Sequence, residues 1–143
     1  MGQLRNVCKI SRTLSIPSGL QNSQLDDFAI ELIDLWKTRQ MRGSCLVSYL
    51  YTMPVGFLLL EEGEKTTIRG LWVDPTFRKQ GIGESLIRES IKLCANSVLY
   101  VNANESAVGF YEKLGFQRGE RRKDFPDQIR MTYARVGKDA GVV

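Results

Sequence analysis

The sequence contains no histidine among its 143 residues. Histidine is the base of Ser-His-Asp and Cys-His catalysis and the commonest metal ligand, so both mechanisms and most transition-metal sites are excluded. The three cysteines are odd in number and contain no Cys-x-x-Cys pair, which indicates neither a disulfide framework nor a zinc site. We therefore expect no metal, and any proton transfer has to use carboxylates, tyrosines or water.

Long hydrophobic runs are also missing, since no segment approaches the roughly 20 apolar residues of a membrane-spanning helix. The first residues lack the apolar core of a secretory signal. We therefore expect a cytoplasmic protein that forms one domain over residues 1–143, as a monomer or a homodimer, without a membrane partner. The net charge of +4 suits an anionic cofactor but is too small to indicate nucleic acid by itself.

Hydrophobic periodicity predicts the order of the secondary structure. A helix is expected from Ser23, because Ser23 and Asp26 have the spacing of an N-terminal cap. This helix and two further ones are expected over residues 23 to about 39–43, 81–95 and 105–114. Seven strands are expected over residues 7–11, 44–51, 55–61, 66–74, 97–102, 116–121 and 129–136.

One part of this order predicts parallel strands. Strand 66–74, helix 81–95 and strand 97–102 make a βαβ unit, so the two strands should be parallel neighbours. The short connections elsewhere predict antiparallel pairs. The expected fold is therefore α+β, with a mixed, mainly antiparallel sheet and a central parallel βαβ unit.

The segment between strand 66–74 and helix 81–95 has the features of a phosphate-binding loop. Arg78 and Lys79 supply positive charge, and Gly81 and Gly83 stand where the helix begins. A helix N-terminus offers unpaired N–H groups and the positive end of its dipole, so an anion gains several donors there. The glycines let the backbone come close to a bulky pyrophosphate.

Two common glycine-rich loops do not fit. A Walker A loop needs Lys followed by Ser or Thr after its second glycine, and the dinucleotide fingerprint needs a third glycine where this chain has Leu86. The remaining pattern, Arg-x-x-Gly-x-Gly over residues 78–83, resembles the acyl-CoA loop of the GNAT superfamily of N-acetyltransferases. Residues 104–116 resemble the second signature of that family, in which an Asn opens a short helix ending in Phe-Tyr-Glu-Lys-x-Gly-Phe. The resemblance is clearest over residues 44–135.

The resemblance implies acetyl-CoA as a cosubstrate and a site between the two parallel strands. In the family the strand before the loop carries a bulge and parts from its neighbour, and the pantetheine arm lies between them. The backbone N–H of Leu71 would then bind the thioester carbonyl, and Tyr111 would protonate the departing thiolate. These are the two implied catalytic groups. The implied cofactor-binding residues are Leu71, Val73, Arg78, Lys79, Gln80, Gly81, Ile82, Gly83, Asn104 and Tyr111.

Two of these roles rest on further reasoning. Reference pKa values near 10 for a phenol and 8.5 for a thiol predict that Tyr111 can give up its proton at little cost. Asn104 has two open roles, because its side chain could reach the pantetheine or cap the helix that follows.

The sequence departs from the family at the general base. Many members carry Glu four residues before the position of Leu71, and this chain has Thr67 there. Glu61 and Glu62 could act through a water, or the acceptor could have a low pKa of its own. The expected acceptor side offers Trp36, Arg39, Arg42, Phe125 and Asp127, which together give no clear chemical preference. An aromatic and basic lining would suit an acidic or amphipathic acceptor, but ordinary core and surface roles explain each residue as well.

The leading hypothesis is an acetyl-CoA-dependent N-acetyltransferase acting on an amine of a small molecule or a protein. One alternative is a toxin-type GNAT enzyme that acetylates aminoacyl-tRNA, and nucleic acid is expected as a partner only in that case. Its phosphate contacts would come from the basic cluster Arg118, Arg121, Arg122 and Lys123. Another alternative is a catalytically silent acyl-CoA-binding regulatory module.

Overall fold

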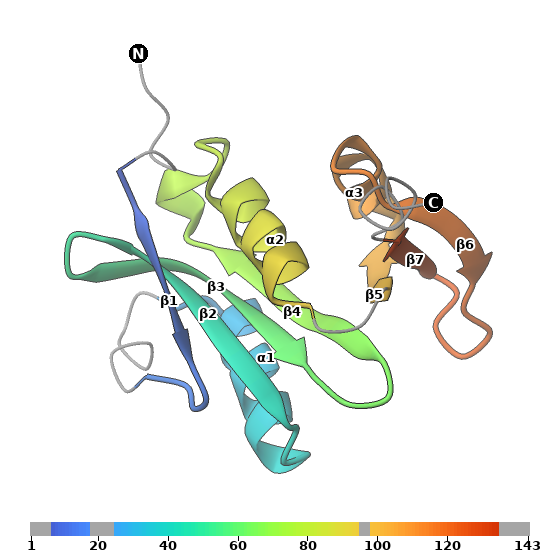
Figure 1. Ribbon diagram of the computed structural model, residues 1–143, viewed down its shortest axis with the longest axis horizontal. Coiled ribbons are helices and arrows are strands. Elements are labelled where there is room, and N and C mark those ends of the chain that lie inside the picture. Colours follow the sequence, from blue (N-terminus) through green and yellow to red (C-terminus); the bar gives the residue numbers. More distant parts are fainter. Residues whose placement is uncertain (1–6, 18–24, 95–97, 135–143) are drawn as a thin grey trace, which may run out of the picture.

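The computed structural model describes residues 7–17, 25–94 and 98–134 (Figure 1). In these ranges the strands form one sheet of seven, in the order β1-β2-β3-β4-β5-β7-β6. The strands are β1 (Lys9–Thr13), β2 (Gly43–Leu50), β3 (Met53–Glu61), β4 (Thr66–Val73), β5 (Val98–Asn104), β6 (Gln117–Arg121) and β7 (Gln128–Ala134). The helices are α1 (Asp27–Thr38), α2 (Ile82–Leu93) and α3 (Val108–Lys113), with short 3-10 turns η3 (Pro75–Phe77) and η4 (Glu105–Ala107).

The sheet is mixed and mainly antiparallel, as the sequence predicts. β4 and β5 are parallel, and the other neighbouring strands are antiparallel. The α2 helix makes the connection between the two parallel strands, so the predicted central βαβ unit is confirmed. No helix of the described ranges is both long enough and apolar enough to cross a membrane.

Helices cover both faces of the sheet, and the alternation along β3 shows which side chains face them. Phe57 and Leu59 point into a core cluster with α1, whereas Leu58 and Leu60 point into a second cluster with α2 and α3. In Figure 1 the α2 helix lies in front of the strands and α1 lies behind them. Burial on both faces explains why β3 reads as a continuous apolar run rather than an alternating one.

The α1 helix begins later than the sequence predicts. Its N-cap is Asp26, whose Oδ1 accepts a hydrogen bond from the backbone N–H of Ala29 at 2.9 Å. The same Oδ1 accepts a hydrogen bond from the indole Nε1 of Trp72 at 3.1 Å. This bond to a buried core residue favours Asp26 as the cap. Asp caps a helix as well as Ser does. Ser23, the expected cap, lies outside the described residues, and Asp26 takes the role assigned to it.

The predicted helix at 105–114 is instead two short pieces, η4 and α3. Most other predicted boundaries differ from the observed ones by one or two residues.

The β4 strand has an irregularity that affects its pairing with the neighbouring strands. Leu59 of β3 lies opposite Gly70, and the next residue, Leu60, lies opposite Ile68, so Arg69 is the extra residue of a β-bulge. On its other edge β4 pairs with β5 only at Thr66–Ile68. Beyond Ile68 the two strands separate, because a bulge bends its strand and increases the local twist.

Candidate functional site

The separated edges of β4 and β5 border two adjoining cavities. The larger one, of about 530 Å³, extends past α3 to the loop at Arg78. The smaller one, of about 360 Å³, lies between the C-terminal part of α1 and the turn between β6 and β7. The residues that line both cavities are Leu32, Ile68, Arg69, Asn102 and Gln128. The two cavities therefore adjoin each other near the point where the strands separate.

The α1 helix runs alongside β4 and links the two ends of this space. Near its start, Asp26 lies 3.7 Å from the guanidinium of Arg78 in the loop. At its middle, Leu32 approaches Gly70 so closely that an added Cβ would lie 2.9 Å from Leu32 Cδ1. At its end, Arg39 lines the smaller cavity. Glycine at position 70 therefore allows the helix to lie against the bulged strand.

The backbone of Leu71 and Val73 faces the open side of β4. The N–H of Asp74 donates to the carbonyl of Val55 on β3 at 2.8 Å. Because successive N–H groups of a strand point to opposite edges, those of Leu71 and Val73 point away from β3. The carbonyl of Val73 agrees with this, since it accepts from Arg78 Nε at 2.9 Å. The two predicted backbone groups thus lie on the part of the β4 edge that does not pair with β5.

The basic loop has the geometry expected at the start of a helix. Gly81 is the N-cap of α2 with φ of 84°, a left-handed conformation that glycine adopts without strain. The first bond of the helix runs from Ser85 N–H to the carbonyl of Gly81 at 3.0 Å. The N–H groups of Ile82 and Gly83 precede that bond and can point at an anion.

Not every side chain of the loop is available to a ligand. Ile82 is 1% exposed and belongs to the core, so only its backbone can contribute. Arg78, by contrast, lines the larger cavity while it bonds to Val73 and Asp26. Lys79 is exposed and Gln80 half-buried, and both lie between Arg78 and the helix start.

Tyr111 lines the larger cavity but is only 6% exposed. Its ring packs edge-on against Phe110 and Phe116, with centroid distances of 5.1 and 5.3 Å. Burial raises its pKa to about 12. The difference from a thiol near 8.5 is about 3.5, which corresponds to roughly 5 kcal/mol. Burial therefore makes proton donation by Tyr111 more costly than its reference pKa suggests, and its role as the proton donor stays a prediction, while a phenol that stays protonated can also act as a hydrogen-bond donor.

Asn104 lies where the cavity meets η4. It occupies the N-cap position, but its side chain makes no capping hydrogen bond. It lines the larger cavity instead. Of the two roles that the sequence left open, capping is not observed.

Glu61 and Glu62, the two carboxylates that the sequence left open as bases acting through a water, line neither cavity. Glu61 is opposite the buried Thr67 and bonds to Arg69 Nε at 2.6 Å, while Glu62 lies 3.6 Å from Arg12. Among the described residues, no carboxylate lines either cavity, and no group of three His, Cys, Asp or Glu side chains could hold a metal. Within the described ranges, the cavity lining therefore consists of apolar, polar and cationic side chains, without a carboxylate.

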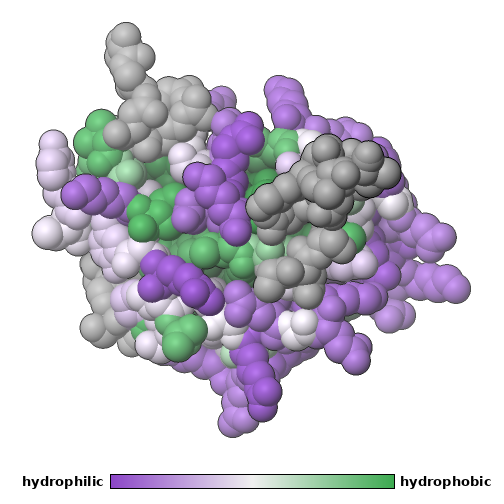
Figure 2. Space-filling view, viewed as in Figure 1, coloured by the Kyte–Doolittle hydropathy of each residue, from purple (hydrophilic) through white to green (hydrophobic). Residues whose placement is uncertain are grey.

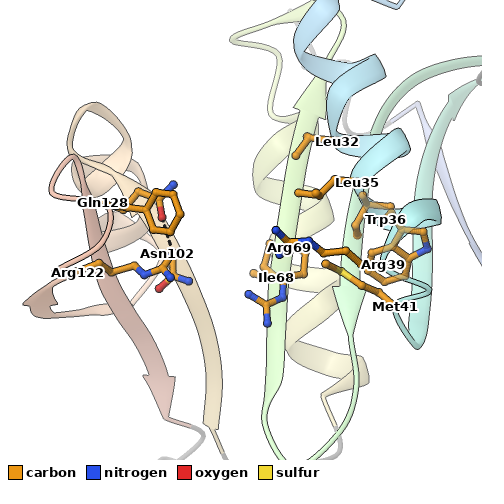
Figure 3. Close-up of a pocket in the computed structure, with 12 residues that line it drawn as sticks. Leu32, Leu35, Trp36, Arg39, Met41, Ile68, Arg69, Asn102, Arg122 and Gln128 are labelled. Carbon is orange, nitrogen blue, oxygen red and sulfur yellow. Dashed lines mark hydrogen bonds between the residues drawn. The ribbon is translucent and has the colours of Figure 1, made fainter.

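Part of the predicted acceptor side lines the smaller cavity. Trp36, Arg39 and Phe125 line it, whereas Arg42 and Asp127 do not. Figure 3 shows Arg39 and Arg69 on one wall and Arg122, Asn102 and Gln128 on the other. Arg69, Asn102 and Gln128 line both cavities and were not among the residues predicted from the sequence. A charged residue inside strand 66–74 and a polar one ending the apolar strand 97–102 were the available signals.

The basic cluster near β6 is largely engaged within the protein. Arg121 donates to Glu105 at 2.9 Å and to the carbonyl of Pro126 at 2.6 Å, and it lowers the pKa of Glu105. Arg118 lies 3.9 Å from Glu105, and Arg122 bonds to Gln128. Figure 2 shows hydrophilic residues covering this edge of the molecule. The cluster is therefore a surface network more than a free phosphate-binding patch.

Comparison with known proteins identifies the same segment. The acetyltransferase (GNAT) domain matches residues 42–118, more than half of the chain. The peptidyl-lysine N-acetyltransferase YjaB of Salmonella typhimurium is 45% identical over 65 residues, which are 45% of this chain and 43% of that protein. The N-alpha-acetyltransferase RimI of Mycobacterium tuberculosis is 35% identical over 85 residues, 57% of this chain and 52% of that protein.

The chain thus spans about half the length of these curated relatives. Among solved structures, a GNAT family acetyltransferase from Elizabethkingia anophelis with acetyl-CoA bound has a TM-score of 0.70 at 24% identity. That match covers 90% of this chain and 99% of the other. It shows that the two proteins share a fold.

Proposed function

The chain belongs to the GNAT family of acetyltransferases, and we propose that it transfers the acetyl group of acetyl-CoA to a primary amine. The observation that carries the proposal is the open edge of β4. It presents Leu71 to a cavity that extends to Arg78 in the loop before α2, and the N–H of Val73 points to the same edge. An extended chain with amide groups can pair along such an edge while its pyrophosphate meets the helix N-terminus.

The residues present fit this substrate from end to end. Arg78, Lys79 and Gln80 and the backbone of residues 81–83 would hold the pyrophosphate. The backbone of Val73 and the side chain of Asn104 would hold the pantetheine amides, and Leu71 N–H would bind the thioester oxygen. A preorganised donor of this kind contributes about 3 kcal/mol to transition-state stability.

The reaction needs no covalent enzyme intermediate. The amine nitrogen attacks the thioester carbon, a C–N bond forms, the C–S bond breaks and the sulfur leaves as a thiolate. The nitrogen loses one proton and the thiolate gains one, so the products are an amide and free CoA. Tyr111 stabilises the thiolate by donating a hydrogen bond from its protonated phenol, and water carries the proton.

Because no carboxylate lines the described cavities, the amine has to reach the thioester in its neutral form. The same observation favours one second candidate, a catalytically silent acyl-CoA-binding module. The tRNA alternative has less support, because Arg118 and Arg121 are already paired with Glu105.

Two measurements on the intact chain separate these functions. Titration calorimetry with acetyl-CoA tests the cofactor assignment, and absence of binding would refute the proposal. Release of CoA thiol with a panel of amines, with the acetylated product identified by mass spectrometry, tests transfer. Binding without any product from any amine would favour the silent module.

A further inference from the structure

In the part of the chain that the structure describes, the smaller cavity is lined by three arginines and no carboxylate, which is an unusual lining for a site that receives an amine. The arginines come from separate parts of the fold. Arg39 is the C-cap of α1, Arg69 is the bulged residue of β4, and Arg122 follows β6. Their convergence on one cavity makes it suited to a ligand that carries negative charge.

The three charges are not equally available. Arg69 is paired with Glu61 at 2.6 Å, which neutralises it. Arg122 is held by uncharged partners, since it donates to Gln128 Oε1 at 2.8 Å and lies 4.6 Å from the centre of the Phe125 ring. Within the described ranges, neither Arg39 nor Arg122 forms an ion pair with a carboxylate. Two guanidinium charges therefore remain unbalanced on facing walls of the cavity (Figure 3).

Building on the proposed transferase function, we propose that the acceptor is a small primary amine that also carries a carboxylate or a phosphate, which Arg39 and Arg122 bind. A guanidinium presents several N–H donors in a plane that matches both anions. The cavity of about 360 Å³ has the size of a small-molecule site. It adjoins the larger cavity at Arg69 and Asn102, so the amine of such a molecule can point toward the thioester.

The arginine charges also explain how the acceptor amine can react without a carboxylate base in the cavity lining. A positive environment disfavours the protonated form of an amine, because like charges repel. An anionic group on the acceptor supplies the attraction that a cationic amine alone would lack. The arginines thus favour an acceptor that carries both an amine and an anionic group, and they favour the neutral form of its nitrogen. A purely cationic polyamine would meet repulsion at both ends.

Matched acceptors test the proposal directly. With saturating acetyl-CoA, kcat/KM is measured for 4-aminobutyrate, its uncharged amide and 1,4-diaminobutane, and for O-phosphoethanolamine against ethanolamine. We expect at least about a tenfold preference for the anionic member of each set, equal to about 1.4 kcal/mol, with the diamine poorest. The carboxylate and phosphate arms show which anion the site prefers.

Substitutions of single arginines test which side chains cause the preference for anionic acceptors. Arg39→Gln, at an exposed helix end, should abolish most of it by raising KM for the anionic acceptor, and Arg122→Gln should do the same. Arg42→Gln is the matched control. It removes the same charge only three residues after Arg39, and the side chain of Arg42 lines neither cavity. It should leave the preference unchanged.

Three results would overturn the proposal: equal rates for anionic and neutral acceptors, equal losses in Arg39→Gln and Arg42→Gln, or acetylation of peptides alone. Failure of the proposed function looks different. In that case calorimetry detects no acetyl-CoA binding, or no amine in the panel releases CoA.

Discussion

Replacement of Gly83 by leucine should stabilise the protein and at the same time abolish acetyl-CoA binding. Gly83 is the second residue of α2, and a Cβ built there would lie 3.7 Å from Val73 Cγ2 and Phe110 Cζ and 3.8 Å from Leu71 Cδ2. These are ordinary contact distances, so the fold can accept the side chain. Leucine favours a helix over glycine by about 0.8 kcal/mol, which raises Tm by about 3 °C for a chain of this size.

The new side chain would nevertheless point toward Leu71 and Phe110, which line the larger cavity. It would compete with the pantetheine and pyrophosphate for that space, and we expect Kd for acetyl-CoA to rise by at least about 30-fold, roughly 2 kcal/mol. Gly109→Leu is the matched control. Gly109 is also the second residue of a helix, and a Cβ there would meet nothing within 4 Å. Calorimetry and thermal unfolding of both variants measure the two effects.

Unchanged acetyl-CoA binding by a folded Gly83→Leu protein would refute the assignment of this cavity to the cofactor. Equal weakening in both variants would show that the loss does not come from the cavity.

Further predictions concern the reaction and the fold. Tyr111→Phe should lower kcat about tenfold with little change in acetyl-CoA affinity, measured by calorimetry, because it removes one hydroxyl and keeps the ring. Because burial raises the pKa of Tyr111 to about 12, the parent rate should show no loss from ionisation of this phenol up to about pH 10. In the parent, kcat/KM for the acceptor should rise with pH toward the acceptor's own pKa, whereas Thr67→Glu, which buries a carboxylate, should add a limb near pH 6 to 7. Asp26→Ala should reduce the unfolding free energy by about 1 kcal/mol. The N–H of Ala29, with Trp72 and Arg78, holds the pKa of Asp26 below 3.8, so this stabilisation is present above pH 4 and is lost as pH falls through the folded-state pKa. A parent-to-variant difference that stays constant down to pH 2 would contradict that account.

The order of elements could be predicted because periodicity and turn residues are local signals. The segment from Thr66 to Asn104 was the most predictable, since a parallel βαβ unit has one favoured hand and a helix start follows its loop. The predicted start of α1 was wrong because the observed cap, Asp26, also accepts a hydrogen bond from Trp72, 46 residues away. No pattern within a short window reports such a partner.

The candidate site was predictable for the backbone and less so for the side chains. Leu71 and Val73 were identified through a family resemblance, and the register places them on the open edge. Arg69 reached the site only through a bulge, which depends on how β3 and β4 pair. The raised pKa of Tyr111 depends on Phe110 and Phe116 and their neighbours, so the residue type alone could not give it.

The separation of β4 from β5 also affects how the protein should behave in concentrated solution. It creates two strand edges inside the sheet, and unpaired edges can recruit a strand from another molecule. Residues 70–73 contain neither a charge nor a proline, the usual means by which natural proteins block such pairing. A ligand in the gap therefore shields the sheet from self-association. Protein saturated with acetyl-CoA should remain monodisperse in light scattering at concentrations where the unliganded protein aggregates.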